Sequence, residues 1–151
     1  MERGLDLAIS RMVRIPSYSV DPTLKNYHWL DLVKGQFDAY DVGADTALLL
    51  DTEGNIAEGP GFNIFTVKGT RLKTPAANVL PGITRQTVFD LCKEMRIDVA
   101  ASTISPGALA DSDEVFVTST AGGIMPVTQI DTKRIANGQV GALTQKISDR
   151  Y

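Results

Sequence analysis

The spacing of apolar residues divides the chain into short strands and a few helices. Apolar runs between turn residues predict strands at 5–15, 46–50, 62–67, 71–74, 98–104, 114–117 and 124–130. Apolar residues that recur every three or four positions predict helices at 25–40, from 83 or 84 onward and at 141–151, with a short helical turn at 106–110. Because hairpins alternate with helices, we predict an α+β fold built on a curved, mixed sheet.

Composition limits the classes of protein to which the chain can belong. It has 151 residues, 43% of them hydrophobic and 22% charged, which is typical of a globular domain with an ordinary core. The net charge of −3 argues against non-specific binding to nucleic acid, which needs a basic face. No apolar stretch approaches the length of a membrane span, and charges interrupt the first twenty residues, where a signal peptide would be apolar. We therefore expect neither a nucleic-acid nor a membrane partner.

The chain contains one cysteine and one histidine, and both counts limit its chemistry. Cys92 has no partner for an internal disulfide and lies among apolar helix positions, so we expect its side chain to be buried. His28 alone excludes a metal site with several histidine ligands, and we expect no metal. The default location for such a chain is the reducing cytoplasm.

Two loops concentrate groups that bind anions. In LPGITRQT, residues 80–87, Gly82 precedes a helix whose first N–H groups, with the Thr84 and Thr87 hydroxyls, can bind an anion, although a plain capped helix would look the same. Residues 118–123 place hydroxyls and two glycines between two strands, where an ordinary turn is the alternative. Together the loops suggest one phosphate held from two sides. The chain has no Walker motif and no G-x-G-x-x-G after a strand, which argues against nucleoside triphosphates and dinucleotides.

A carboxylate and a lysine complete the candidate chemistry. Glu58 lies between a strand and a Gly-Pro-Gly kink, where it is either solvated or turned inward to pair with a cationic ring nitrogen. Lys25, flanked by Leu24, Tyr27 and Trp29, is either a surface charge or, with its pKa lowered by apolar neighbours, a Schiff-base nucleophile. A lysine imine, a carboxylate at a ring nitrogen and a phosphate held by two loops together match the chemistry of pyridoxal phosphate.

Four stretches carry a resemblance to a known family. RIPSYSVDPTLKNYHW, EGPGFNIF, LPGITR and TSTAGGIMPV occur in the order and at the spacing of the fold-type IV, or class IV, pyridoxal-phosphate aminotransferases. The resemblance runs from about Leu5 to the C-terminus, and the first and last stretches are most similar to the (R)-selective amine and branched-chain-like members. It implies the C-terminal, cofactor-binding domain of that fold, a pseudo-barrel of curved mixed sheet with packed helices.

The resemblance also implies roles for single residues. Lys25 matches the Schiff-base lysine, which moves a proton between the substrate carbon and the C4′ carbon of the cofactor. Glu58 matches the glutamate that contacts the pyridine nitrogen, and Asn63 matches the asparagine at the end of that motif. Leu80 matches the residue that packs on the cofactor ring.

The remaining implied contacts lie around the phosphate and the substrate. Ile83, Thr84 and Thr120 match the phosphate ligands, and Thr120 and Ala121 can offer N–H groups to a substrate carboxylate. Trp29 stands where many relatives have a tyrosine near the phenolic oxygen of the cofactor, and its indole N–H can only donate.

Family members are about twice this length and are homodimers with the active site near the interface. We therefore predict that residues 1–151 form a single cofactor-binding domain, clipped at both ends and lacking the N-terminal domain. The parent protein would transfer an amino group from an amino acid or amine to a 2-oxo acid, whereas this piece alone would be weak or inactive. Three alternatives remain open: a lyase of the same fold, similar to aminodeoxychorismate lyase, that expels pyruvate; a non-catalytic remnant that binds a phosphorylated ligand; or an α+β domain without a site.

Overall fold

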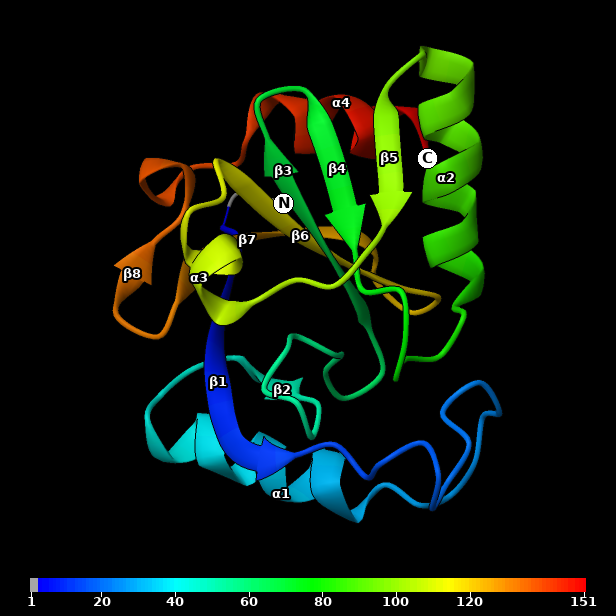
Figure 1. Ribbon diagram of the computed structural model, residues 1–151. Helices are drawn as coiled ribbons and strands as arrows, with labels where there is room; N and C mark the ends of the chain where they lie inside the picture. The colour runs from blue at the N-terminus through cyan, green and yellow to red at the C-terminus, as the bar shows by residue number, and fades with distance from the viewer. Residues whose placement is uncertain (1–2) are drawn as a thin grey trace.

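The computed structural model describes residues 3–151 as one mixed sheet with helices packed against it (Figure 1). The strands are β1 (Leu5–Val13), β2 (Thr46–Leu50), β3 (Asn63–Lys68), β4 (Arg71–Thr74), β5 (Asp98–Ala101), β6 (Glu114–Ser119), β7 (Gly123–Ile130) and β8 (Lys133–Arg134). The helices are α1 (Leu30–Asp41), α2 (Ile83–Met95), α3 (Pro106–Ala110), the short 3₁₀ helix η1 (Ala136–Gly138) and α4 (Ala142–Arg150). The predicted α+β class with a mixed sheet is confirmed.

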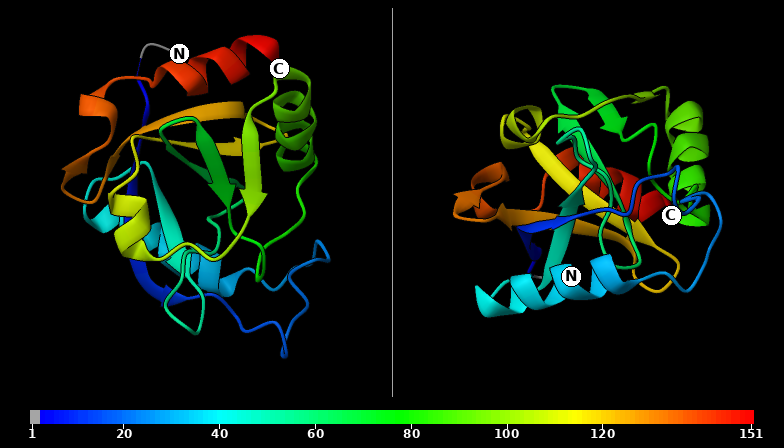
Figure 2. Two further views of the ribbon diagram at one scale, coloured as in Figure 1. Left: turned by 45° about the horizontal axis from the view of Figure 1, so that its top comes forward. Right: turned by 60° about the horizontal axis from the view of Figure 1, so that its bottom comes forward.

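The sheet changes from parallel to antiparallel pairing along its width. Its strand order is β2-β1-β7-β6-β3-β4-β5, with β8 paired to β7. β1 is parallel to both neighbours, β7 to β4 pair antiparallel in turn, and β5 returns parallel to β4. Figures 1 and 2 show α1 beside β1 and β2 at one end of the sheet and α2 beside β5 at the other. None of the helices within residues 3–151 is both long and apolar enough to cross a bilayer.

The pairing of β3 with β6 places core and site residues on one face. Phe65 is opposite Phe116 in this register, and their rings stack 4.9 Å apart at the centroids. Two residues before Phe65 and two residues after Phe116, on the same face, Asn63 is opposite Thr118. Phe89 of α2 meets Phe65 edge-on, so the same aromatic cluster fixes the helix against these strands.

Cys92 belongs to the α2 side of this cluster and is fully buried, as predicted. Burial raises the pKa of its thiol to about 11. The thiol therefore stays protonated at neutral pH and is a packing residue rather than a nucleophile.

The helix predicted at 25–40 begins later than expected, at Leu30. The Asn26 side chain donates to the Leu24 carbonyl at 2.9 Å and accepts the His28 amide at 2.8 Å. These local bonds satisfy backbone groups without a helix, which explains why the helix does not extend back to Lys25. The predicted strands at 5–15 and 98–104 are likewise shorter, ending at Val13 and Ala101.

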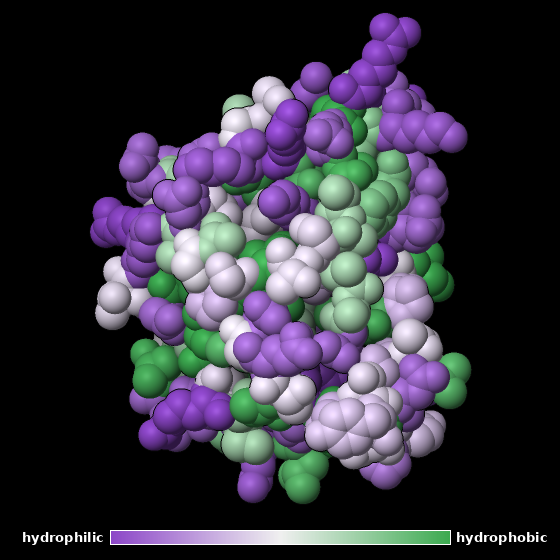
Figure 3. All heavy atoms as spheres, in the orientation of Figure 1, coloured by the Kyte–Doolittle hydropathy of each residue, from purple (hydrophilic) through white to green (hydrophobic). Residues whose placement is uncertain are grey.

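The face of α1 that packs on the sheet carries its small residues. Gly35 and Ala39 are buried, and a Cβ atom at Gly35 would press on the end of the Leu49 side chain of β2, so a larger residue would require that side chain to move. Leu32 is also buried, whereas the larger aromatic residues Phe37 (61% exposed) and Tyr40 are turned outward. In Figure 3, hydrophobic spheres lie along the lower edge of the molecule, where Figure 1 places α1.

Candidate active site

The segments singled out in the sequence meet at one open cavity of about 340 Å³. Its walls come from the turn before α1, the loop between β2 and β3, the start of α2 and the end of β6. The expected cofactor contacts that line it are Lys25, Trp29, Glu58, Asn63, Leu80, Ile83, Thr84 and Thr120. Ala121 is exposed and lies outside this lining. Thr87 also lies outside it, and its hydroxyl donates to the Ile83 carbonyl of its own helix.

Glu58 is a buried carboxylate at the cavity wall. Its Oε2 accepts the Leu80 amide at 3.0 Å, and its Oε1 accepts the Arg14 guanidinium at 3.1 Å. Burial raises the pKa of Glu58, while the Leu80 N–H and the positive charge of Arg14 act in the opposite direction. Of the two alternatives in the sequence, solvated or turned inward, the structure shows the inward one.

Asn63 and Glu58 together fix the backbone N–H and C=O groups of Leu80. Asn63 Nδ2 donates to the Leu80 carbonyl at 2.8 Å, while the Leu80 N–H donates to Glu58. Gly82 makes the close approach possible, because a Cβ atom there would overlap with Oδ1 of Asn63. The segment leading into α2 is therefore held at the cavity by two buried side chains from a different part of the chain.

The beginning of α2 offers hydrogen-bond donors to the cavity. Gly82 is the N-cap and has no side chain that could bond to the N–H groups of the first turn. The Oγ1 atoms of Thr84 and Thr118 are buried and have no hydrogen-bond partner within residues 3–151, although both residues line the cavity. A buried hydroxyl without a partner is unfavourable, and two of them beside a helix N-terminus fit an anionic group such as a phosphate.

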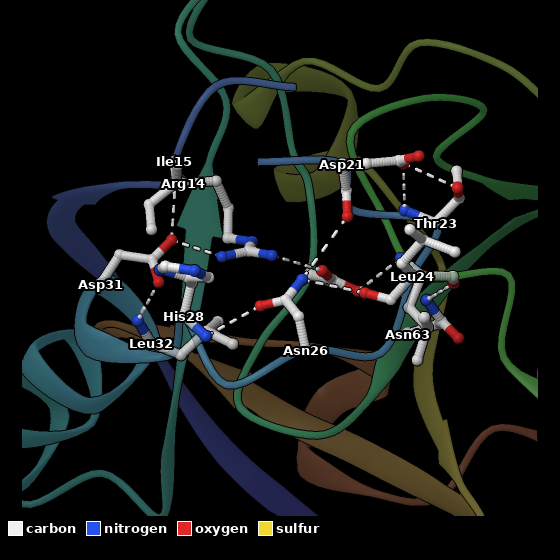
Figure 4. Close-up of polar contacts among 12 residues, drawn as sticks. Arg14, Ile15, Asp21, Thr23, Leu24, Asn26, His28, Asp31, Leu32 and Asn63 are labelled. Atoms are coloured by element: carbon white, nitrogen blue, oxygen red, sulfur yellow. Dashed lines mark hydrogen bonds and ion pairs between the residues drawn. The ribbon is translucent and has the colours of Figure 1, made fainter. Parts of the chain in front are cut away.

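Lys25 lies on an exposed segment, residues 23–29, that lines the same cavity as the start of α2. Within the described part of the chain its Nζ makes neither a hydrogen bond nor an ion pair. The segment is shaped by local bonds: Asp21 Oδ1 accepts both the amide and the hydroxyl of Thr23, as Figure 4 shows, and the Asn26 bonds follow. Leu24 and Tyr27 are exposed beside it, and Trp29 at the cavity is 40% exposed. The amine is thus free to bond to a ligand.

Reasoning from the sequence missed three residues of this site. Arg14 and Asp31 pair with each other in the interior, and Arg14 also lines the cavity. The sequence gives no sign of these contacts, because Arg14 is 17 positions from Asp31 and 44 positions from Glu58. Thr118 was included in the small-residue loop but not singled out, although it is opposite Asn63 in the β3–β6 register.

The site combines a free amine, a buried carboxylate and a donor-rich helix start around one cavity. Such a set can hold a molecule with a carbonyl group, a basic ring nitrogen and a phosphate. The Thr84 and Thr118 hydroxyls fit a phosphate in particular, since neither has a hydrogen-bond partner within residues 3–151.

Comparison with known proteins identifies similar chains. The family model described as amino-transferase class IV matches residues 1–130. The chain is 38% identical over 152 residues to a putative branched-chain-amino-acid aminotransferase of Methanocaldococcus jannaschii, covering 99% of this chain and 53% of that protein. It is 32% identical over 154 residues to the branched-chain-amino-acid aminotransferase of Escherichia coli K12, covering 100% of this chain and 50% of that protein.

Solved structures give the same picture. The branched-chain amino acid aminotransferase of Thermobaculum terrenum, in its PLP form, superimposes with a TM-score of 0.95 at 30% sequence identity. That match covers 99% of this chain and 50% of the Thermobaculum chain. The 151-residue chain therefore spans about half the length of the relatives that it matches.

Proposed function

The chain belongs to the class IV aminotransferases, and on this basis we propose that it is the cofactor-binding domain of a pyridoxal-phosphate-dependent aminotransferase. The observation that carries the proposal is the cavity lined by Lys25, Glu58, the start of α2 and two threonine hydroxyls that have no hydrogen-bond partner within residues 3–151. The printed names of the relatives favour a branched-chain amino acid and its 2-oxo acid as the substrate pair.

The residues of the cavity suit the three parts of pyridoxal phosphate. Lys25 would hold its aldehyde carbon and Glu58 its ring nitrogen, with Leu80 against the ring. The phosphate would bind at the helix start through the backbone of Ile83 and the hydroxyl of Thr84. Thr118 and Thr120 would complete the phosphate site from the end of β6.

Each chemical group of the chain then has a definite task. When bound, the cofactor supplies an electron-withdrawing ring that makes the α-hydrogen of the amino substrate acidic. Glu58, buried and hydrogen-bonded, keeps a proton on the ring nitrogen. Lys25 accepts and returns the substrate proton as general base and acid, which its exposed amine can do without breaking another contact. The backbone amides of Thr120 and Ala121 are the proposed contacts of the substrate carboxylate.

The substrate side of the site is proposed to need parts of the protein beyond these 151 residues. Around Lys25 the apolar side chains of Leu24, Tyr27 and Leu30 are exposed, and the relatives have about twice this length. We therefore propose that a second domain and a second subunit cover this segment in the complete protein. The isolated chain would bind the cofactor but would turn over substrate weakly or not at all.

Borohydride trapping tests the proposal directly. The chain is mixed with pyridoxal phosphate, reduced with borohydride and digested, and the modified peptide is identified by mass spectrometry. We expect a pyridoxyl group on Lys25 and not on the other six lysines. Lys25→Ala should abolish selective labelling, while the matched control Lys34→Ala, at an exposed position of α1, should leave it intact. Labelling spread over all lysines would contradict the proposed role of Lys25.

A second assay separates transfer from elimination. The loaded protein, supplied with a branched-chain amino acid and a 2-oxo acid, should yield one new amino acid for each amino donor consumed. Release of pyruvate without amino-group acceptance would instead identify the lyase of the same fold.

A further inference from the structure

A buried arginine joins two carboxylates behind the cavity. Arg14, directly after β1, donates through one nitrogen to Asp31 Oδ2 and through another to Glu58 Oε1 at 3.1 Å. The exposed fractions of the three side chains are 10%, 5% and 8%. Figure 4 shows Arg14 beside Asp31 and Ile15, where β1 leads into the turn before α1. Pairs this well shielded from water are not ordinary surface salt bridges.

The backbone holds the far end of this group in place. Asp31 Oδ2 also accepts the Ile15 amide at 2.8 Å, and its Oδ1 accepts the Leu32 amide at 2.8 Å. Asp31 is thus fixed by two peptide groups, Arg14 is fixed by Asp31, and Glu58 is fixed by Arg14. The planar guanidinium suits this task because its nitrogens point in set directions toward two acceptors at once.

The charges of the group do not cancel. Two carboxylates face one guanidinium, so the ionised group carries one surplus negative charge in the interior. Arg14 and Glu58 line the cavity, whereas Asp31 does not. A surplus charge shielded from water is costly unless a positive group approaches it, and the cavity is the open side from which one can come.

We propose that Arg14 is a positioning residue that keeps Glu58 ionised and aimed into the cavity, so that Glu58 can hold a proton on a ring nitrogen. Asp31 acts through Arg14 by fixing its guanidinium. The assignment of the ring nitrogen rests on the proposed function, while the charge state of Glu58 is a property of this chain alone. The other titratable groups that line the cavity are Lys25, His28 and Arg85.

The first test measures Glu58 itself without any cofactor. Its side-chain carboxyl carbon is followed by NMR across pH in the original chain, in Arg14→Met and in the matched control Arg11→Met. Arg11 lies on β1 three residues earlier, is exposed and makes no contact with Glu58. Loss of an opposite charge at this distance should raise the titration midpoint of Glu58 by about 1–3 pH units, and the control should leave it in place. Arg14→Lys, which keeps the charge, should restore most of the original midpoint.

A second measurement needs no substitution at Arg14 and decides the matter if Arg14→Met does not fold. The guanidinium nitrogen signals of Arg14 should shift with the titration midpoint of Glu58, and Glu58→Gln should remove that inflection. The signals of Arg85, which stacks on Phe89, should not follow it. An Arg14 signal that ignores Glu58, or a folded Arg14→Met chain with an unchanged Glu58 midpoint, would overturn the inference.

The outcomes separate this inference from the proposed function. Failure to label Lys25 with pyridoxal phosphate would remove the proposed function but leave the Glu58 titration to be decided on its own. Selective labelling with an unchanged Glu58 midpoint in Arg14→Met would keep the function and remove the role of Arg14.

Discussion

The two walls of the cavity are built in different ways. One wall consists of Glu58, Asn63, Leu80, Thr84 and Thr118, and we call it the buried wall. The other consists of residues 23–29, which include Lys25, and we call it the exposed wall. The buried wall is held by bonds between distant segments and by a packed aromatic cluster. The exposed wall is held by bonds that span only two to five residues.

The fold itself preorganises only one of the two walls. The proposed ring and phosphate contacts lie on the buried wall, so ligand binding there would lose little conformational entropy. The exposed wall depends on its own local bonds. Matched substitutions on the two walls test this distinction.

The largest contrast should come from the aromatic residues. Phe65 is completely buried on the same strand as Asn63 of the buried wall, whereas Phe37 is 61% exposed on α1, the helix that follows the exposed wall in the chain. Phe65→Ala should lower the free energy of unfolding by about 3–5 kcal/mol. Phe37→Ala should change it by less than about 0.5 kcal/mol. Urea unfolding followed by circular dichroism measures both, and equal losses would mean that the exposed face of α1 is not free.

Two asparagines give the next contrast. Asn63→Ala removes the donor to the Leu80 carbonyl in the interior and should lower the free energy of unfolding by about 1–3 kcal/mol. Asn26→Ala removes three bonds in an exposed turn and should lower it by about 0.5 kcal/mol. The same urea titration compares them, and a larger loss for Asn26 would reverse the assignment of the two walls.

A threonine pair separates ligand binding from stability. Thr84→Val removes a buried hydroxyl that has no partner within residues 3–151, so the fold should be as stable or slightly more stable. Affinity for pyridoxal phosphate should fall about tenfold, equivalent to ~1.4 kcal/mol, in a fluorescence titration. Thr87→Val is the control, because its hydroxyl bonds to the Ile83 carbonyl and lies outside the cavity. Equal affinity losses would show that the Thr84 hydroxyl has no special part in binding.

The smallest contrast is in the acid titration of the two walls. Burial raises the pKa of Glu58, whereas bonds from Thr23 lower the pKa of Asp21 beside the exposed wall. The contribution of Glu58 to stability is therefore complete below its unfolded pKa and is lost as pH rises through its folded pKa. That of Asp21 is present above its unfolded pKa and is lost as pH falls through its folded pKa. Carboxyl NMR should place the two midpoints on opposite sides of the ordinary values, 4.5 for Glu58 and 3.8 for Asp21.

Local pattern was enough for much of the fold. The strands at 46–50 and 71–74 and the turn of helix at 106–110 agree with prediction residue for residue, because alternation and flanking turn residues define them locally. The face of α1 could not be predicted, because Gly35 sets it through its approach to Leu49. The two-residue strand β8 and the three-residue η1 are too short to leave a periodic signal.

The site divides in the same way. Sequence pattern alone left Lys25 and Glu58 between a surface role and a chemical one, and the resemblance to the family singled them out. The structure then brought their segments to one cavity. Neither the pattern nor the resemblance singled out Arg14 and Asp31. An arginine after a strand and an aspartate in the first turn of a helix are common in sequences, and only the structure shows that these two are buried and paired.

The β3–β6 register has a consequence for how such a chain can change. Asn63 and Thr118 share their face with the Phe65–Phe116 stack, and side chains alternate along each strand. A single-residue insertion between the two positions of either strand would therefore turn the phenylalanine or the site residue to the opposite face. Insertions there should be eliminated through misfolding before any change of activity can be tested. The segment around Lys25 takes no part in this register, so a change of sequence there leaves the orientation of the core side chains unaltered.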